Sequence, residues 1–362
     1  MFGTAVFYFS ISIITAVLFE FSLRVKGTFK KICAALSILI PAFFAGIRYG
    51  IGTDYFVTYK PYFDYLAGHG SLQLVNRESL DIGFKIINLA VIKLGGNLQM
   101  VLFISSVLTL FAFRKAILLY KDKMNVGMAA FVFMLMYYQT SFNIVRQVLA
   151  ASIVLYAFHY IEEKEPFKFT LWVIVAALFH KTAIVVLPFY LFVNLVSKRK
   201  HKILFFMAYA IIFFAVFNFD KFAPLARLID PSGYYAIYLR KVSSFEMSTG
   251  LLIRTVPYIS AVILMWKKIQ GDRTLYIYLN SFLLGSIMRI IVYMTQFDAD
   301  RIAMYFLMSQ VVFIPYLYKF RKQNWRNYAG SMLLVGTTIL LWYFDFIYMG
   351  RTETVPYVTI FR

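Results

Sequence analysis

The sequence predicts an all-α integral membrane protein, and its composition and its apolar blocks carry that prediction. Of the 362 residues, 61% are hydrophobic and 15% are charged, whereas soluble domains have about 45–50% apolar and about 25% charged residues. The apolar residues form blocks such as 1–21, 32–45 and 203–217, which approach the roughly 20 residues that cross a bilayer. Because backbone groups in lipid must pair within their own segment, we expect these blocks to be helices.

The blocks divide a single polytopic domain, 1–362, into about 12 transmembrane helices. Loops rich in lysine and arginine stay in the cytoplasm, so the basic clusters set the orientation and make 48–80 and 219–249 outer loops. The basic clusters lie at 24–31, 114–123, 198–202, 267–273 and 319–326. The uninterrupted spans are expected near 3–23, 31–47, 98–118, 125–141, 144–161, 203–218, 250–266, 274–296, 301–318 and 328–348.

Two apolar segments do not fit simple spans. If 81–95 crossed the membrane fully, the basic cluster after it would lie outside, so we expect a re-entrant or interfacial helix there. The segment 167–196 is too long for one span and has basic signals near both ends, with His180 at its middle. Two short helices that meet at His180 satisfy both signals, and such breaks are tolerated where they line a polar cavity.

Several function classes lose support at this point. The formal charge of +20 lies in short loops between spans, where topology and anionic headgroups explain it better than nucleic acid does. The first segment lacks the basic start and cleavage site of a signal peptide, so we expect a retained span. The sequence has no internal repeat of the kind expected for a transporter built from two symmetric halves. We expect no metal, although Asp298 and Asp300 could hold a divalent cation; we favour surface carboxylates that flank Arg301.

Cations that the topology puts outside or within the membrane need a separate explanation. They are Arg48, Arg146, Lys181, Arg254, Arg289 and Arg301. A charge within a span is costly and usually faces a cavity or a partner, which makes it a functional candidate. The alternative is that the side chain snorkels to the headgroups, which Arg254 and Arg301 near span ends could do.

The densest outer segment is Arg48-Tyr-Gly-Ile-Gly-Thr-Asp-Tyr55, followed by Tyr59. Arg48 could hold phosphate oxygens in bidentate fashion. Asp54 could accept a proton or a sugar hydroxyl bond, or pair with Arg48. Tyr55 and Tyr59 combine an apolar face with a polar tip, as sugar-binding residues do. The alternative is an aromatic belt beside a glycine turn.

His180 is the best candidate for a general base, because histidine titrates nearest neutral pH and the predicted break would turn it toward the outer cavity. A structural histidine with satisfied hydrogen bonds is the alternative.

Together these motifs resemble the EpsG family of polysaccharide-assembly membrane proteins, which are similar in role to Wzy polymerases. The segment from Arg48 to Tyr55 with Tyr59 carries most of the resemblance. It is supported by 144–153, by 176–183 with Pro188, and by Val355-Pro-Tyr357. These segments occur in order over nearly the whole chain.

The resemblance implies a glycosyltransferase that moves glycan from a polyprenyl-diphosphate-linked donor onto another lipid-linked repeat unit. It implies a fold similar to the lipid-dependent, GT-C-like glycosyltransferases, without a cofactor. The implied roles are diphosphate binding by Arg48, Arg146, Arg289 and Arg301, glycan binding by Tyr55, Tyr59 and Gln147, and proton removal by His180 or Asp54. The implied location is the bacterial cytoplasmic membrane, with the site facing the periplasm or exterior. Membrane lipids and other polysaccharide-assembly proteins are the implied partners.

Four other functions stay open. A flippase or exporter of lipid-linked oligosaccharide would also need a cationic cavity, but one that opens to both faces. A ligase that joins finished glycan to another acceptor shares the donor chemistry. A membrane acyltransferase has only His180 in its favour, and a purely structural role in an assembly complex would need no site. Whether the product is capsule, exopolysaccharide or O-antigen is also open.

Overall fold

The computed structural model of the chain describes residues 2–69, 81–196, 211, 249–292 and 299–361. Helices dominate these ranges, and the described part contains no strand beyond an isolated bridge between Arg48 and Thr359. The predicted all-α class is therefore confirmed. The expected span 203–218, nearly all of loop 219–249 and the end of loop 48–80 lie outside the described residues, apart from Ile211.

The first half of the chain forms α1 (Phe2–Arg24), α2 (Gly27–Gly46), η1 (Tyr55–Tyr59), α3 (Lys60–His69), α4 (Ile82–Lys93), α5 (Leu98–Leu118), α6 (Val126–Phe133), η2 (Met134–Tyr138), α7 (Thr140–Asn143), α8 (Val145–Ala157) and α9 (His159–Glu162). The second half forms α10 (Pro166–Phe179), η3 (Lys181–Val186), α11 (Leu187–Val196), α14 (Thr249–Leu264), α15 (Trp266–Gly271), α16 (Arg273–Val292), α17 (Ala299–Leu307), α18 (Gln310–Tyr318), α19 (Trp325–Trp342), η5 (Tyr343–Tyr348) and η6 (Arg351–Glu353).

Five helical stretches in the described residues are long and apolar enough to cross a membrane. They are Phe2–Arg24, Gly27–Gly46, Leu98–Leu118, Arg301–Tyr318 and Trp325–Tyr348. They coincide with the expected spans 3–23, 31–47, 98–118, 301–318 and 328–348. The expected spans 125–141, 144–161 and 250–266 appear instead as shorter or interrupted helices.

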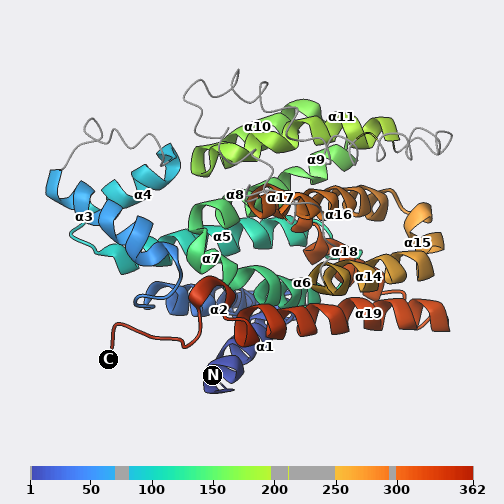
Figure 1. Cartoon of the computed structure of the whole chain (residues 1–362), viewed down its shortest axis with the longest axis horizontal. Helices are drawn as coiled ribbons and strands as arrows, with labels where there is room; N and C mark the ends of the chain where they lie inside the picture. The colour runs from blue at the N-terminus through green and yellow to red at the C-terminus, as the bar shows by residue number, and fades with distance from the viewer. Residues whose placement is uncertain (1, 70–80, 197–210, 212–248, 293–298, 362) are drawn as a thin grey trace.

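The long helices lie side by side along the long axis of the molecule (Figure 1). α1 packs against α2 and α6, α2 against α5, α5 against α8, and α8 against α10. Buried aromatic rings fill the contacts; Phe113 and Phe133, for example, stack with 4.1 Å between ring centroids. A Cβ on Gly46 would lie 2.8 Å from the Cβ of Phe103, so this glycine lets α2 approach α5 closely, as small residues do in membrane helix pairs.

The interruption at His180 agrees with the prediction for 167–196. α10 ends at Phe179, His180 adopts extended backbone angles (φ −156°, ψ 108°), and η3 begins at the next residue. α11 then folds back along α10, because the rings of Phe169 and Tyr190 lie 5.4 Å apart. The two helices form a hairpin with His180 at its tip.

The chain has two further local features that bear on the site. α7 ends at Asn143, and Ile144 leaves helical geometry before α8 begins (φ −100°, ψ 55°). α4 has 12 residues, which is about 18 Å of helix and shorter than the roughly 30 Å of hydrocarbon. Its length agrees with the expected non-crossing helix at 81–95.

The bundle has two distinct ends, with α3 and α4 at one and α15 at the other (Figure 1). We call the end with α15 the basic end and the end with α3 and α4 the site end. At the basic end, four loops meet, around residues 119–125, 162–165, 271–273 and 319–324. Lys123 pairs with Glu162 at 2.6 Å there, and Lys319 Nζ donates to the carbonyl of Asp122 at 3.2 Å. At the site end, the segment after α2 pairs with the C-terminal segment, where the amide of Tyr49 donates to the carbonyl of Val358 at 3.0 Å.

Candidate functional site

Four segments bring charged side chains together at the site end. Asp81 lies directly before α4, Arg146 lies in the first turn of α8, His180 and Lys181 lie at the tip of the hairpin, and Arg301 lies near the start of α17. The helix breaks at Ile144 and His180 create this arrangement, because α8 and α10 pack against each other and both breaks face the site end. We call these five residues the Asp81 cluster.

Asp81 is the centre of the cluster. Its Oδ2 accepts a hydrogen bond from Arg146 Nη1 at 3.0 Å, and its Oδ1 accepts one from the backbone N–H of Lys181 at 3.0 Å. The carboxylate side chain is 7% exposed. Burial raises the pKa of Asp81, and the bond from the Lys181 amide and the charge of Arg146 oppose that rise. The carboxylate therefore joins α8 to the hairpin tip instead of capping its own helix.

The imidazole of His180 is held through its Nδ1 atom. This nitrogen lies 3.8 Å from Oδ2 of Asp81 and 3.4 Å from the hydroxyl of Thr182, which in turn lies 3.0 Å from the hydroxyl of Tyr305. The His180 side chain is 17% exposed. In the described part of the chain, its polar contacts are all made by Nδ1, so the ring is oriented on that side.

The protonation state of His180 follows from its surroundings. The residue lies in the hairpin turn, outside the candidate spanning helices. Burial lowers its pKa to about 3, and the positive charges of Arg146, Arg301 and Lys181 act in the same direction. At neutral pH the imidazole is therefore uncharged.

The two arginines of the cluster differ in exposure. Arg146 is 16% exposed, pairs with Asp81 and lies over the ring of Phe84, with 5.9 Å from its guanidinium carbon to the ring centroid. Arg301 has an exposed side chain, and its backbone carbonyl accepts a hydrogen bond from Nε2 of Gln147. The Oε1 of Gln147 is buried and has no hydrogen-bond partner among the described residues.

Arg48 lies in the protein interior, apart from the cluster. Its side chain donates to the carbonyls of Ala45 and Phe142, the latter at 3.2 Å, and its guanidinium carbon lies 4.6 Å from the centroid of the Phe142 ring. The residue is 1% exposed. These contacts tie the end of α2 to α7.

The two candidate tyrosines are also buried. The hydroxyl of Tyr59 donates to the carbonyl of Asn143 at 2.6 Å and accepts from the amide of Val145 at 3.0 Å. It thereby satisfies backbone groups on both sides of the break between α7 and α8. The hydroxyl of Tyr55 accepts from Nε2 of Gln99 at 2.9 Å. Asp54 is half-buried and directly precedes η1.

Arg289 lies on α16 and lines a separate small cavity with Arg254, Tyr258 and Gln310. Arg254 is buried and pairs there with Asp345, a residue of η5. None of the Asp81 cluster lines that cavity. The structure thus brings Arg146, Arg301, Gln147 and His180 together and leaves Arg48, Arg289 and Tyr55 elsewhere. Tyr59 lies beside the cluster, where its hydroxyl contacts the amide of Val145.

Asp81 is the residue that the sequence analysis missed. An aspartate directly before an apolar segment indicates a helix N-cap, which gave no reason to place it in a site. Lys181 was noted only as a charge at membrane depth. Within the described residues no group of three or more His, Cys, Asp and Glu side chains is placed to hold a metal. Asp298 lies outside those residues, and the side chain of Asp300 is not described.

The comparison with known families agrees with these observations. No curated protein and no solved structure matches the chain. The EpsG family matches residues 31–359, which include every residue of the Asp81 cluster and nearly the whole chain. The protein therefore belongs to the EpsG family and is a polysaccharide-assembly membrane protein.

Proposed function

We propose that this protein is a polysaccharide polymerase that transfers glycan from a polyprenyl-diphosphate-linked donor to another lipid-linked repeat unit on the outer membrane face. The observation that supports this most directly is the Asp81 cluster, which combines three cations with an uncharged histidine. Family membership supports the substrate class, because the EpsG family belongs to polysaccharide assembly.

The cations fit the leaving group of this reaction. The acceptor hydroxyl oxygen forms a bond to the anomeric carbon of the donor, and the bond from that carbon to the diphosphate oxygen breaks. The electron pair of the broken bond stays on the diphosphate, whose negative charge increases. We give Arg146, Lys181 and Arg301 the role of stabilising that charge, because preorganised cations contribute most where charge develops.

His180 fits the role of general base. With Nδ1 facing Asp81 and Thr182, its Nε2 takes the proton that the acceptor hydroxyl loses. Asp81 orients the imidazole and stabilises the imidazolium that forms, so we give it a positioning role. Asp54 is the alternative base.

The remaining candidates have different parts in this proposal. Gln147 offers its unpartnered Oε1 to a sugar hydroxyl. Arg48 and Tyr59 act as positioning residues, because their polar atoms bind the backbone that shapes the break before α8. Arg289, in its own cavity, would contact a diphosphate only outside the Asp81 cluster.

The membrane arrangement is part of the same proposal. The basic end faces the cytoplasm by the positive-inside rule, so the Asp81 cluster faces the periplasm or exterior of a bacterial cytoplasmic membrane. About 12 membrane helices and a GT-C-like architecture complete the arrangement. Five candidate spans and several shorter apolar helices in the described residues support the first of these.

A flippase or exporter of lipid-linked oligosaccharide is less well supported. Such a protein must present binding groups to both faces in turn, whereas the Asp81 cluster lies at one end of the bundle. A glycan ligase would use the same donor chemistry, and the acceptor alone distinguishes it from a polymerase.

The test is a chain-length assay on purified protein in vesicles that contain the host's lipid-diphosphate repeat unit. The wild type should produce a glycan ladder that Arg146→Ala abolishes and that Arg326→Ala, an exposed arginine at the basic end, leaves unchanged. A folded wild type that yields no ladder would contradict polymerase activity. Glycan joined once to a different acceptor would indicate a ligase, and transport across the vesicle membrane would indicate a flippase.

A further inference from the structure

A cavity of about 640 Å³ lies far from the Asp81 cluster, between α1, α6 and α18. Its size is typical of sites that hold a small ligand. It reaches the basic end of the bundle, since Arg24 ends α1, Asn125 precedes α6 and Lys319 follows α18. Nothing in the proposed transfer reaction uses it.

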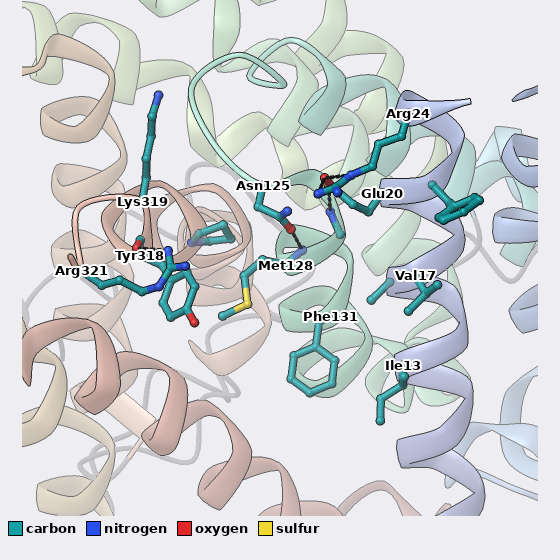
Figure 2. A pocket seen from close by; sticks show the side chains of 14 residues that line it. Ile13, Val17, Glu20, Arg24, Asn125, Met128, Phe131, Tyr318, Lys319 and Arg321 are labelled. Atoms are coloured by element: carbon teal, nitrogen blue, oxygen red, sulfur yellow. Dashed lines mark hydrogen bonds and ion pairs between the residues drawn. The ribbon is translucent and has the colours of Figure 1, made fainter. Parts of the chain in front are cut away.

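The lining of this cavity changes from charged to apolar along its length. Figure 2 shows Arg24, Lys319 and Arg321 at one end, with Phe131 and Ile13 at the other. The apolar wall faces outward from the bundle, because Val17 in the middle of α1 is 54% exposed. α1 is one of the candidate spanning helices, so this wall faces lipid. A ligand here would need a polar head and an apolar tail.

The charges at the mouth favour a negatively charged head. Glu20, the acidic residue among the lining side chains, accepts hydrogen bonds from Arg24 at 2.8 Å and from the amide of Gly127 at 3.1 Å. Among the described residues, Lys319 and Arg321 donate only to backbone carbonyls, those of Asp122 and Tyr318. Neither has a carboxylate partner among the described residues, so two positive charges at the edge of the cavity have no anion paired with them.

The close packing beneath the mouth shows that the cavity has a defined wall. A Cβ on Gly127 would lie 2.7 Å from the carbonyl oxygen of Ala16 and 2.8 Å from the Cβ of Glu20. The glycine therefore lets α6 approach α1 at this level, and Glu20 closes the contact by accepting from the first turn of α6. Below this contact, Val17 and Phe131 line the apolar part of the cavity.

We propose that this cavity binds an anionic phospholipid from the leaflet at the basic end. The phosphate contacts Lys319 and Arg321, and an acyl chain lies against α1 and α6 along Val17 and Phe131. Basic pockets between membrane helices bind anionic headgroups in this way. A free phosphate would use the cations but leave the apolar wall without a partner, and a zwitterionic lipid would leave the excess positive charge uncompensated.

The experiment counts bound lipid by native mass spectrometry on the full-length protein in detergent. Phosphatidylglycerol and phosphatidylcholine with identical acyl chains are the probes. Three variants are compared with the wild type. The first is a double variant with Lys319→Gln and Arg321→Gln, the second is Val17→Trp, and the third is a double variant with Lys30→Gln and Lys31→Gln. The last pair removes two exposed charges from the first turns of α2, outside the cavity, and serves as the matched control. All variants must elute as the wild type does; Ile13→Trp replaces Val17→Trp if that variant does not fold.

We expect the wild type to bind phosphatidylglycerol more tightly than phosphatidylcholine. The Lys319 and Arg321 double variant should weaken phosphatidylglycerol binding by roughly 20-fold, since each cation near an anionic lipid contributes about fivefold. Val17→Trp should weaken it as well, because the indole fills the chain site, and the Lys30 and Lys31 variant should stay within about twofold of the wild type.

Three results would overturn the proposal. Equal losses in both double variants would mean general attraction to a basic surface. A normal affinity in Val17→Trp and in Ile13→Trp would mean that the lipid does not enter the cavity. Equal affinity for the two lipids in the wild type would mean that the site does not select an anion.

Discussion

The Oδ2 atom of Asp81 accepts a 3.0 Å hydrogen bond from Nη1 of Arg146, and the two side chains are only 7% and 16% exposed. The residues are 65 positions apart in the chain, so the bond joins the segment before α4 to the first turn of α8. The same carboxylate accepts from the amide of Lys181 at the hairpin tip. One aspartate thereby holds three separate segments in register at the candidate site.

The first prediction concerns this ion pair. Asp81→Ala and Arg146→Ala should each lower the free energy of unfolding by about 2 kcal/mol, because each removes the ion pair from a largely buried charge. The double variant should lose less than the sum, with a coupling energy of about 1 kcal/mol or more. Denaturation in detergent measures the free energy of unfolding of the wild type, the two single variants and the double variant. Strict additivity would show that the two charges do not interact.

The second prediction concerns the break before α8. Tyr59→Phe removes the hydroxyl that serves Asn143 and Val145, and leaves two buried backbone groups unpaired, at a cost of about 1–3 kcal/mol. Turnover should fall because the break positions Arg146. Tyr55→Phe is the matched control, since Tyr55 is an equally buried residue whose hydroxyl contacts the Gln99 side chain and no backbone group among the described residues. If both variants lost turnover equally, the break would have no special role.

The third prediction concerns pH. A histidine with the ordinary pKa of about 6.5 is only about 3% neutral at pH 5, whereas the lowered pKa of His180, about 3, keeps it neutral there. As the base, His180 should therefore support kcat/KM that does not fall between pH 7 and pH 5 through loss of the neutral imidazole. His180→Gln should still bind the donor and lose turnover by about 10²-fold or more. Normal turnover in that variant would exclude His180 and move the role to Asp54 or to no base at all.

The fourth prediction separates an interior arginine from an exposed one. Arg48→Ala should reduce the amount of folded protein, because Arg48 is 1% exposed and its loss leaves the carbonyls of Ala45 and Phe142 without its donors. Arg301→Ala should fold normally, because its side chain is exposed, and should weaken binding of the diphosphate donor. Thermal melting and donor titration of both variants provide the measurement. The opposite pattern would make Arg48 the diphosphate contact.

The fifth prediction concerns sidedness. In a Cys33→Ser background, a cysteine in place of Phe361 at the site end should react with a membrane-impermeant maleimide on intact cells. One in place of Lys322 at the basic end should react only after permeabilisation. Both positions are exposed, so access to the reagent decides the result. The reverse labelling would put the Asp81 cluster in the cytoplasm and exclude a polymerase that acts outside.

The sequence by itself determined the features that depend on local composition. Apolar blocks specify helices because backbone groups in lipid must pair within the segment, and five expected spans coincide with long apolar helices. The break at His180 was also predictable, since a polar residue at the centre of an overlong apolar segment interrupts it. Arg146 and Arg301 could be selected because charged groups in spans require a partner, and Gln147 could be selected only through the family resemblance.

Only the tertiary structure decided which of these residues meet. Arg48 and Arg301 have the same side chain and were given the same expected role, yet one is buried against α7 and the other is exposed near the hairpin tip. Asp81 had the pattern of a helix cap, and the packing of α10 against α8 turned it into the link between Arg146 and Lys181. The physical reason is that local periodicity fixes which face of a helix is buried, whereas contacts between segments 65 or 100 residues apart depend on how the helices pack.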